Sequence, residues 1–286
     1  MMRRQARSST WITGRRELHD LGSRACLFPG TAHPTDRHKP DVMRLRRNLG
    51  QLGRADPRDL FPAVLALAGR LRPRAIMIEN VKGLLSPKFA DYREEIAGEL
   101  LALGYESEWR LLNACDFGVP QLRPRAVLVA LPSALWGQFE WPVPLLREGL
   151  VTVGRVLRSS MSWDGWELAD TWAALADQVG PTICGGSRRH GGPDLGPSGA
   201  RKAWAKLGVN GVSLANRVPS KGDQLPIRLT TDQIVLLQGF PGTWMFTGNK
   251  TARYRQIGNA FPPPVAEAVG RSLAAVLRPA PRQPAV

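Results

Sequence analysis

The chain has 286 residues and a net charge of +15, with 39 Lys and Arg against 24 Asp and Glu. That length allows one enzyme-sized core or two smaller ones, and the charge favours a polyanionic partner such as duplex DNA, although a high Arg, Gly and Pro content also follows from GC-rich coding. Three cysteines without a CxxC pair argue against a disulfide framework, and no apolar run is long enough for a membrane span, so a cytoplasmic protein is expected.

Residues 1–50 are expected to form a basic arm that is disordered or unrelated to the rest of the chain. They carry 11 Lys and Arg against four acids, show no sustained hydrophobic period, and are interrupted by Pro29, Pro34 and Pro40. Cys26 lies in this arm, and a lone cysteine without a local signature is not enough to assign a nucleophile.

Helix and strand patterns alternate in residues 51–150, which predicts an α/β fold. The expected elements are a helix from Asp56 to Leu71, a buried strand at Ala75–Ile78, a helix at Phe89–Leu103, and strands at Glu106–Asn113 and Ala126–Leu131. Strand Ala75–Ile78 delivers Glu79 and Asn80 to its carboxyl end, where open α/β sheets bind ligands. A carboxylate held there is partly desolvated, which would raise its pKa, although a surface Glu is the simpler interpretation of this segment alone.

Arg123 and Arg125 lie two residues apart on an extended segment, so both are expected to point to one side of the sheet edge. They could instead be solvated or contact phosphate. Nearby Cys115 is interpreted as a small buried residue at a strand end.

Residues 151–226 lose hydrophobic periodicity and gain Gly, Arg and Pro. Their basic side chains, Arg188, Arg189, Arg201 and Lys202, fit an ordinary basic loop. His190 has no second ligand nearby, so no metal site is expected.

Residues 227–286 regain regular patterning. Thr230 is placed to cap a short helix, and Pro262 to Leu277 predicts a closing helix with proline at its start.

Four blocks occur in an order that resembles the motif set of the DNA cytosine-5 methyltransferases. They are Glu79-Asn80-Val81, then Gln121-Leu122-Arg123-Pro124-Arg125, then Arg228-Leu229-Thr230 with Leu237-Gln238-Gly239-Phe240-Pro241, and finally Arg255-Gln256-Ile257-Gly258-Asn259-Ala260. The likeness covers residues 53–270.

The resemblance implies a truncated Rossmann-like methyltransferase sheet with a smaller, irregular target-recognition domain. Residues 51–150 would be the C-terminal part of the catalytic domain, 151–226 the recognition region, and 227–286 a block that returns to the catalytic domain. In the recognition region, loops would read base edges in the major groove, which makes Arg188, Arg189, Arg201 and Lys202 candidate DNA contacts as the alternative to an ordinary basic loop. The implied reaction is methyl transfer from S-adenosylmethionine to carbon 5 of cytosine in duplex DNA. Asn259 and Ala260 would lie beside the cofactor.

By the same resemblance, Glu79 is the acid that engages nitrogen 3 of cytosine, and Asn80 supports the loop that bears the nucleophile. Arg123 and Arg125 help to hold the target cytosine and that loop. Whether such methylation serves restriction-modification or regulation stays open.

The family's cofactor-binding turn and Pro-Cys loop cannot be identified before Gly53. Cys26 has no preceding proline and lies 53 residues before Glu79, where the family has about forty. The chain alone is therefore expected to be impaired or inactive. The alternatives are a non-catalytic DNA-binding remnant and a subunit completed by a separate N-terminal chain.

Overall fold

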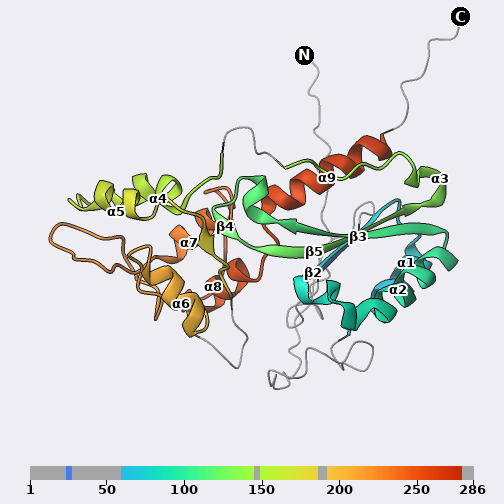
Figure 1. Cartoon of the computed structure of the whole chain (residues 1–286), viewed down its shortest axis with the longest axis horizontal. Coiled ribbons are helices and arrows are strands. Elements are labelled where there is room, and N and C mark those ends of the chain that lie inside the picture. The colour runs from blue at the N-terminus through green and yellow to red at the C-terminus, as the bar shows by residue number, and fades with distance from the viewer. Residues whose placement is uncertain (1–23, 28–58, 145–148, 186–191, 279–286) are drawn as a thin grey trace, which may run out of the picture. The chain divides into compact units, whose positions relative to one another are not determined.

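The computed structural model describes residues 24–27, 59–144, 149–185 and 192–278 (Figure 1). They divide into two compact units. Unit 1 takes the described residues of 1–111, 126–140 and 273–286, and unit 2 takes those of 112–125 and 141–272.

The sheet of unit 1 has four strands in the order β1-β2-β5-β3. These are β1 (Arg24–Leu27), β2 (Ile76–Val81), β5 (Pro124–Pro132) and β3 (Tyr105–Asn113). β1 pairs antiparallel with β2, so that Arg24 stands opposite Glu79. The apolar runs of β2 and β5 are almost wholly buried, as expected for strands covered on both faces. The strands predicted around residues 75–78, 106–113 and 126–131 are confirmed.

Two helices, α1 (Phe61–Leu71) and α2 (Ala90–Ala102), lie together on one side of this sheet in Figure 1. Their apolar faces form one core with the strands, and that core includes Phe61, Leu100 and Leu128. α1 begins with a proline in its first turn and ends where Arg72 adopts a left-handed conformation, its N–H bonded to the carbonyl of Ala68. Both helices were predicted from their apolar periodicity.

Unit 2 is built mainly from helices. They are α4 (Val153–Met161), α5 (Ala169–Leu175), α6 (Ser198–Ala205), α7 (Thr231–Leu237) and α8 (Lys250–Gly258), with a parallel pair of short strands, β4 (Gln121–Leu122) and β6 (Gly180–Pro181). Their shared core contains Trp172, Trp204 and Tyr254. Thr230 and Gln233 form a capping box at the start of α7, which confirms the predicted cap.

The last helix, α9 (Pro263–Leu277), begins in unit 2 and ends in unit 1. Within unit 1, a guanidinium nitrogen of Arg74 donates to the carbonyl of Leu277 at 2.7 Å, which fixes the helix end. This helix agrees with the one predicted from Pro262 to Leu277.

The α/β class is confirmed, but residues 151–226 hold more regular structure than their sequence suggested. The helices there are short, and they are fixed by packing of large side chains such as Trp172 and Trp204 rather than by a long periodic pattern. Ile234 of α7 and Tyr254 of α8 belong to the core of unit 2, and the return of residues 227–286 to the catalytic domain stays a prediction.

Among the helices that the structure describes, none is long and apolar enough to cross a membrane. The described residues also contain no cluster of three or more His, Cys, Asp or Glu side chains suited to a metal ion.

Candidate functional site

Glu79 and Asn80 lie together at the carboxyl end of β2, as the sequence predicted. Glu79 is only 6% exposed, because β2 is covered on both faces up to that residue. Asn80 is half-buried, and its Oδ1 accepts a 2.7 Å hydrogen bond from the backbone N–H of Val81. That bond fixes the turn by which the chain leaves the strand. A carboxylate held in this way loses much of its hydration, which is the condition required of a side chain that shares a proton with a base.

The short 3-10 helix η3 (Lys82–Leu85) follows β2 and is held in place by α2. The guanidinium of Arg93 donates to the carbonyls of Leu84 and Ser86 at 2.6 and 2.9 Å. Bonds from one side chain to two carbonyls limit the movement of the segment after Glu79.

Arg123 is the most completely enclosed charged side chain of unit 2, with 1% exposure. Its Nη1 donates to the carbonyl of Ile183 at 2.7 Å and to Oε1 of Gln121 at 3.3 Å. Its Nη2 donates to the carbonyls of Gly258 and Ala260 at 2.8 and 2.9 Å. The guanidinium therefore joins three stretches that are far apart in the sequence.

Arg125 has a different environment, although it was expected to point the same way as Arg123. It is half-buried, and its Nη1 donates to the carbonyl of Pro124 at 2.9 Å. The backbone between β4 and β5 is irregular at Arg123, so the alternation of a continuous strand does not apply there. Of the two arginines, Arg125 is the one with surface left for a ligand.

Asn259 and Ala260 follow α8, and their surroundings show how far they fit S-adenosylmethionine. Asn259 is exposed, whereas Ala260 is buried and its carbonyl already accepts bonds from Arg123 and from Nε2 of Gln238. A Cβ on Gly258 would stand 2.6 Å from backbone atoms of Gly185, so these two segments are packed backbone to backbone. The described residues at this point form a closed contact rather than a cofactor cradle.

Two of the four predicted DNA contacts lie on α6. Arg201 is half-buried, with its aliphatic stem beside Gly211, and Lys202 is exposed. Arg188 and Arg189 lie outside the described residues. The placement of Arg201 and Lys202 on one short helix is compatible with contact to a nucleic-acid backbone.

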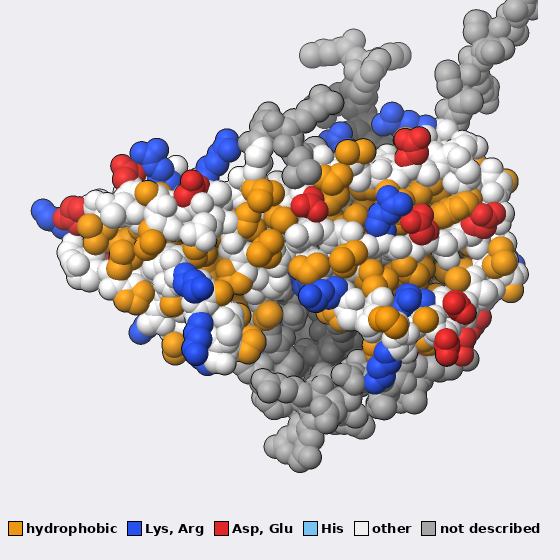
Figure 2. Space-filling model, in the orientation of Figure 1, with side chains coloured by type: hydrophobic (Ala, Val, Ile, Leu, Met, Phe, Trp, Pro, Cys, Tyr) orange, Lys and Arg blue, Asp and Glu red, His pale blue; other side chains and the backbone are white. Residues whose placement is uncertain are grey.

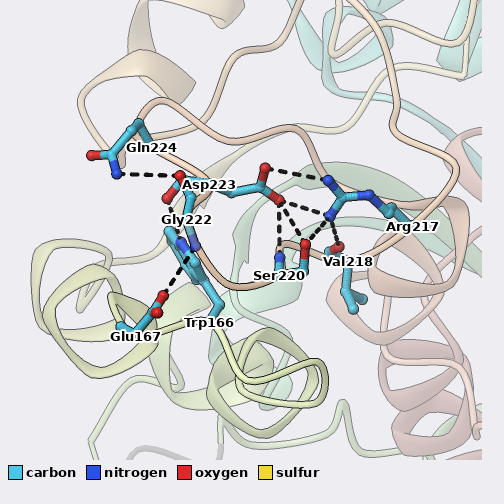
Figure 3. Close-up of polar contacts among 8 residues, drawn as sticks. All are labelled: Trp166, Glu167, Arg217, Val218, Ser220, Gly222, Asp223 and Gln224. Carbon is cyan, nitrogen blue, oxygen red and sulfur yellow. Dashed lines mark hydrogen bonds and ion pairs between the residues drawn. The ribbon is translucent and has the colours of Figure 1, made fainter.

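A rigid loop in unit 2 was not predicted from the sequence (Figure 3). Asp223 accepts two bonds from Arg217, at 2.7 and 3.2 Å, and one from the backbone N–H of Ser220 at 2.9 Å. The Arg217 hydrogen bond, followed by the Ser220 N–H, lowers the pKa of Asp223 to about 2. The loop is thereby closed on itself and presents the exposed Lys221 near its tip.

The same loop is tied to the segment between α4 and α5. The indole N–H of Trp166 donates to the carbonyl of Asp223 at 2.8 Å, and the N–H of Gly222 donates to Glu167 at 3.2 Å, as Figure 3 shows. The run Pro-Ser-Lys-Gly-Asp at residues 219–223 is a turn signal in the sequence. This run predicts a turn, but it does not show which side chains form the hydrogen bonds that close it.

Two cysteines of unit 2, Cys115 and Cys184, are described with their side chains. Cys115 is buried, and burial followed by the charge of Asp116 raises the pKa of its thiol to about 11. Cys184 is exposed. Cys26 is described only through its backbone, as part of β1. The interpretation of Cys115 as a small buried residue agrees with these facts.

Comparisons with known proteins agree with the motif order. The family described as C-5 cytosine-specific DNA methylase matches residues 48–275. The type II methyltransferase M.NaeI of Lentzea aerocolonigenes is 51% identical over 230 residues, covering 79% of this chain and 55% of that protein. M.NgoMIV of Neisseria gonorrhoeae is 44% identical over 231 residues, covering 80% of this chain and 73% of that protein.

The fold also resembles a solved structure, that of S. pombe Dnmt2 methyltransferase, at 19% identity and a TM-score of 0.46 over 78% of this chain and 74% of that one. Among its sequence relatives, the chain spans little more than half the length of M.NaeI and about three quarters of M.NgoMIV. From the extent of the family match and from identities well above 30%, it follows that this chain is a member of the C-5 cytosine-specific DNA methylase family.

Proposed function

We propose that this chain supplies the target-base and DNA-recognition parts of a cytosine-5 DNA methyltransferase that uses S-adenosylmethionine. The observation that carries the proposal is the buried carboxylate of Glu79 at the end of β2, within residues that match the family. The names of the relatives, type II methyltransferases, favour a role in restriction-modification.

The chemistry explains why such a carboxyl group is required. Carbon 5 of cytosine is a poor nucleophile, so a thiolate adds to carbon 6 while an acid engages nitrogen 3, which makes carbon 5 electron-rich. The base must first leave the duplex, because stacking covers its faces. In this proposal Glu79 engages nitrogen 3, and Asn80 holds the chain just beyond it.

The arginines divide between two roles in the same proposal. Arg125 donates to the carbonyl oxygen of the target cytosine, whereas Arg123 holds the surrounding backbone segments in place. Arg201 and Lys202 contact the DNA, and Arg188 and Arg189 are proposed to do the same.

For this chain acting alone, neither cysteine of unit 2 fits the nucleophile that the reaction needs. Cys115 is buried with a raised thiol pKa, and Cys184 has no preceding proline. A raised pKa leaves little thiolate at neutral pH. This observation favours a second candidate function, in which the chain binds DNA and gains methyl transfer only when another chain supplies the Pro-Cys loop. A DNA-binding protein without catalysis is the third.

The test is transfer of labelled methyl groups from S-adenosylmethionine to mixed-sequence duplex DNA by the purified chain. Glu79→Gln removes the acid with little change of volume. Glu94→Gln, on the exposed face of α2, is the matched control. Each protein is also assayed with an added chain that carries the N-terminal motifs of a relative.

The outcomes separate the candidates. Transfer by the unmodified chain that is lost only in Glu79→Gln supports a complete methyltransferase, and Cys26→Ala then tests the source of the thiolate. Transfer that needs the added chain supports a split enzyme. Duplex binding with no transfer in either assay leaves a DNA-binding protein. Activity that survives in Glu79→Gln would remove the proposed role of Glu79.

A further inference from the structure

On the face drawn in Figure 2, Lys and Arg side chains lie singly among apolar ones and do not form one continuous patch. Whether a cation can bind a ligand therefore depends on whether a carboxylate of the chain already pairs with it. Within unit 2 several have a carboxylate partner: Arg158 pairs with Asp170, Arg217 with Asp223, Arg253 with Asp232, and Arg271 with Glu267.

Arg255, in the last turn of α8, has none. It is half-buried, it makes no ion pair with any described residue, and its Nε is enclosed without a hydrogen-bond partner in the described part of the chain. A guanidinium that gives up water without gaining an acceptor costs free energy. The negative end of the helix dipole offsets only part of that cost. Nη1 and Nη2 also bond no described residue, and they are the guanidinium atoms that an incoming anion can reach.

The segment around Arg255 contains no acidic residue of its own. Residues 233–266 contain no Asp or Glu, a run of 34 residues in a chain with 24 acids. Asp232, just before this run, is engaged by Arg253 at 2.6 Å. An incoming anion at Arg255 would thus meet little competition from carboxylates of its own segment.

The position of Arg255 is fixed by the residues beside it. Tyr254 is fully buried and its hydroxyl donates to the carbonyl of Cys184 at 3.0 Å. Gln256 donates to the carbonyl of Thr247 at 2.8 Å, which ties the helix to the preceding loop. A helix held on both sides of Arg255 presents the guanidinium in one place, which reduces the entropy lost when a ligand binds.

The loop before α8 is also exposed in a way that points to a partner. Trp244 is 55% and Met245 85% exposed, although each carries a large apolar surface. This loop directly precedes α8 in the chain, and exposed large apolar side chains occur at interaction sites.

From these observations we infer that Arg255 is a phosphate contact for duplex DNA, on a surface formed by α8 and the loop that precedes it. The planar fork of the guanidinium matches two oxygens of one phosphodiester group. Duplex DNA is the occupant that fits the net charge of +15 and the family of the chain. The inference rests on the proposed function, since it assigns a contact to the DNA that the methyltransferase would bind.

The test is fluorescence anisotropy with a labelled mixed-sequence duplex, between about 50 and 200 mM salt. Arg255→Gln should weaken binding by up to about tenfold, and should reduce the slope of log affinity against log salt by about 0.9, the value for one lost phosphate contact. Arg255→Lys keeps the charge and should retain most of the slope. Arg271→Gln, which removes an exposed and already paired cation of α9, is the matched control and should leave the slope unchanged.

A second measurement excludes a purely structural role. Because the side chain of Arg255 bonds no described residue, Arg255→Gln should leave the free energy of unfolding without DNA unchanged or higher. A lower free energy of unfolding combined with an unchanged salt slope would overturn the inference. So would binding of inorganic phosphate that is lost in Arg255→Gln but does not weaken duplex binding by the unmodified chain at matched ionic strength, because the site would then be one for free phosphate.

The two proposals fail in different ways. If the unmodified chain binds duplex with a steep salt dependence and Arg255→Gln binds identically, only the assignment of Arg255 is wrong. If the unmodified chain shows no salt-dependent binding, both the assignment and the proposed DNA-recognition function are wrong.

Discussion

Gln121 and Gln238 form a buried amide pair although they lie 117 residues apart: Nε2 of Gln121 donates to Oε1 of Gln238 at 2.8 Å, and both side chains are 0% exposed. The free oxygen of Gln121 accepts the N–H of Ile183, and the free nitrogen of Gln238 donates to the carbonyls of Ile257 and Ala260. Each amide thus uses its donor and its acceptor, and together they join three motif blocks of the family within unit 2.

The amide pair should be costly to break from one side. Gln238→Leu removes one partner and leaves a donor of Gln121 buried with a weaker acceptor, the carbonyl of Leu237 at 3.3 Å. Each buried polar group left without a good partner costs about 1–3 kcal/mol, so the free energy of unfolding should fall by at least that amount. Urea unfolding followed by tryptophan fluorescence measures the change.

The control for this prediction is Gln224→Leu, at an exposed position whose Nε2 bonds only the carbonyl of Gly222. It should change stability little. The double variant Gln121→Leu/Gln238→Leu should cost less than the sum of the two single variants, with a coupling of about 0.5–3 kcal/mol. Strictly additive effects would show that the two amides do not act together.

Arg123 should not tolerate replacement by lysine. An ammonium group can reach fewer of the four acceptors that the guanidinium engages, and the unused carbonyls would stay buried. We expect a loss of about 2–4 kcal/mol in the free energy of unfolding. Arg158→Lys, in an exposed pair with Asp170, should change the free energy of unfolding little. Equal losses in the two variants would contradict the central role given to Arg123.

Much of the fold was predictable because its signals are local. The buried strand before Glu79, the capping threonine at position 230 and the proline that opens α9 each act within a few residues of their own position. The helices between residues 151 and 205 were not predicted. They are short, and their packing around Trp172 and Trp204 depends on contacts between distant segments.

In the candidate site, too, the positions of some residues could be predicted from the sequence and those of others could not. The sequence places Glu79 and Asn80 at a strand end, and the structure has them there. The sequence could not reveal that Arg123 turns into the interior, because an irregular backbone at one residue breaks the two-residue alternation on which the expectation relied. Nor does any local pattern predict that Arg255 makes no ion pair with a described residue, since this depends on what the fold brings near it.

The Arg217–Asp223 pair should make stability depend on pH in the acid range. The folded pKa of Asp223 is lowered to about 2, mainly by the hydrogen bond from Arg217 and then by the N–H of Ser220, whereas an unfolded Asp has a pKa of about 3.9. The stabilisation is therefore present above about pH 4 and is lost as the pH falls towards 2.

Asp223→Asn tests this in urea unfolding between about pH 2 and 6. The difference from the unmodified chain should be constant above about pH 4 and should shrink below it. Arg217→Gln removes the main cause of the shift and should shrink the same difference. An Asp223→Asn variant that keeps the full acid dependence of the unmodified chain would show that other carboxylates cause it.

Cys115 and Cys184 should differ in their reactivity towards a thiol reagent. Cys115 is 6% exposed and its pKa is raised to about 11 by burial and then by Asp116, so only about one thiol in a thousand is ionised at pH 8. Cys184 is exposed. Iodoacetamide should therefore label Cys184 in the native protein and Cys115 only after unfolding, as peptide mass spectrometry would show. Fast native labelling of Cys115 would make it a possible nucleophile again. The expected protection instead means that a thiolate able to attack carbon 6 of cytosine has to come from another position.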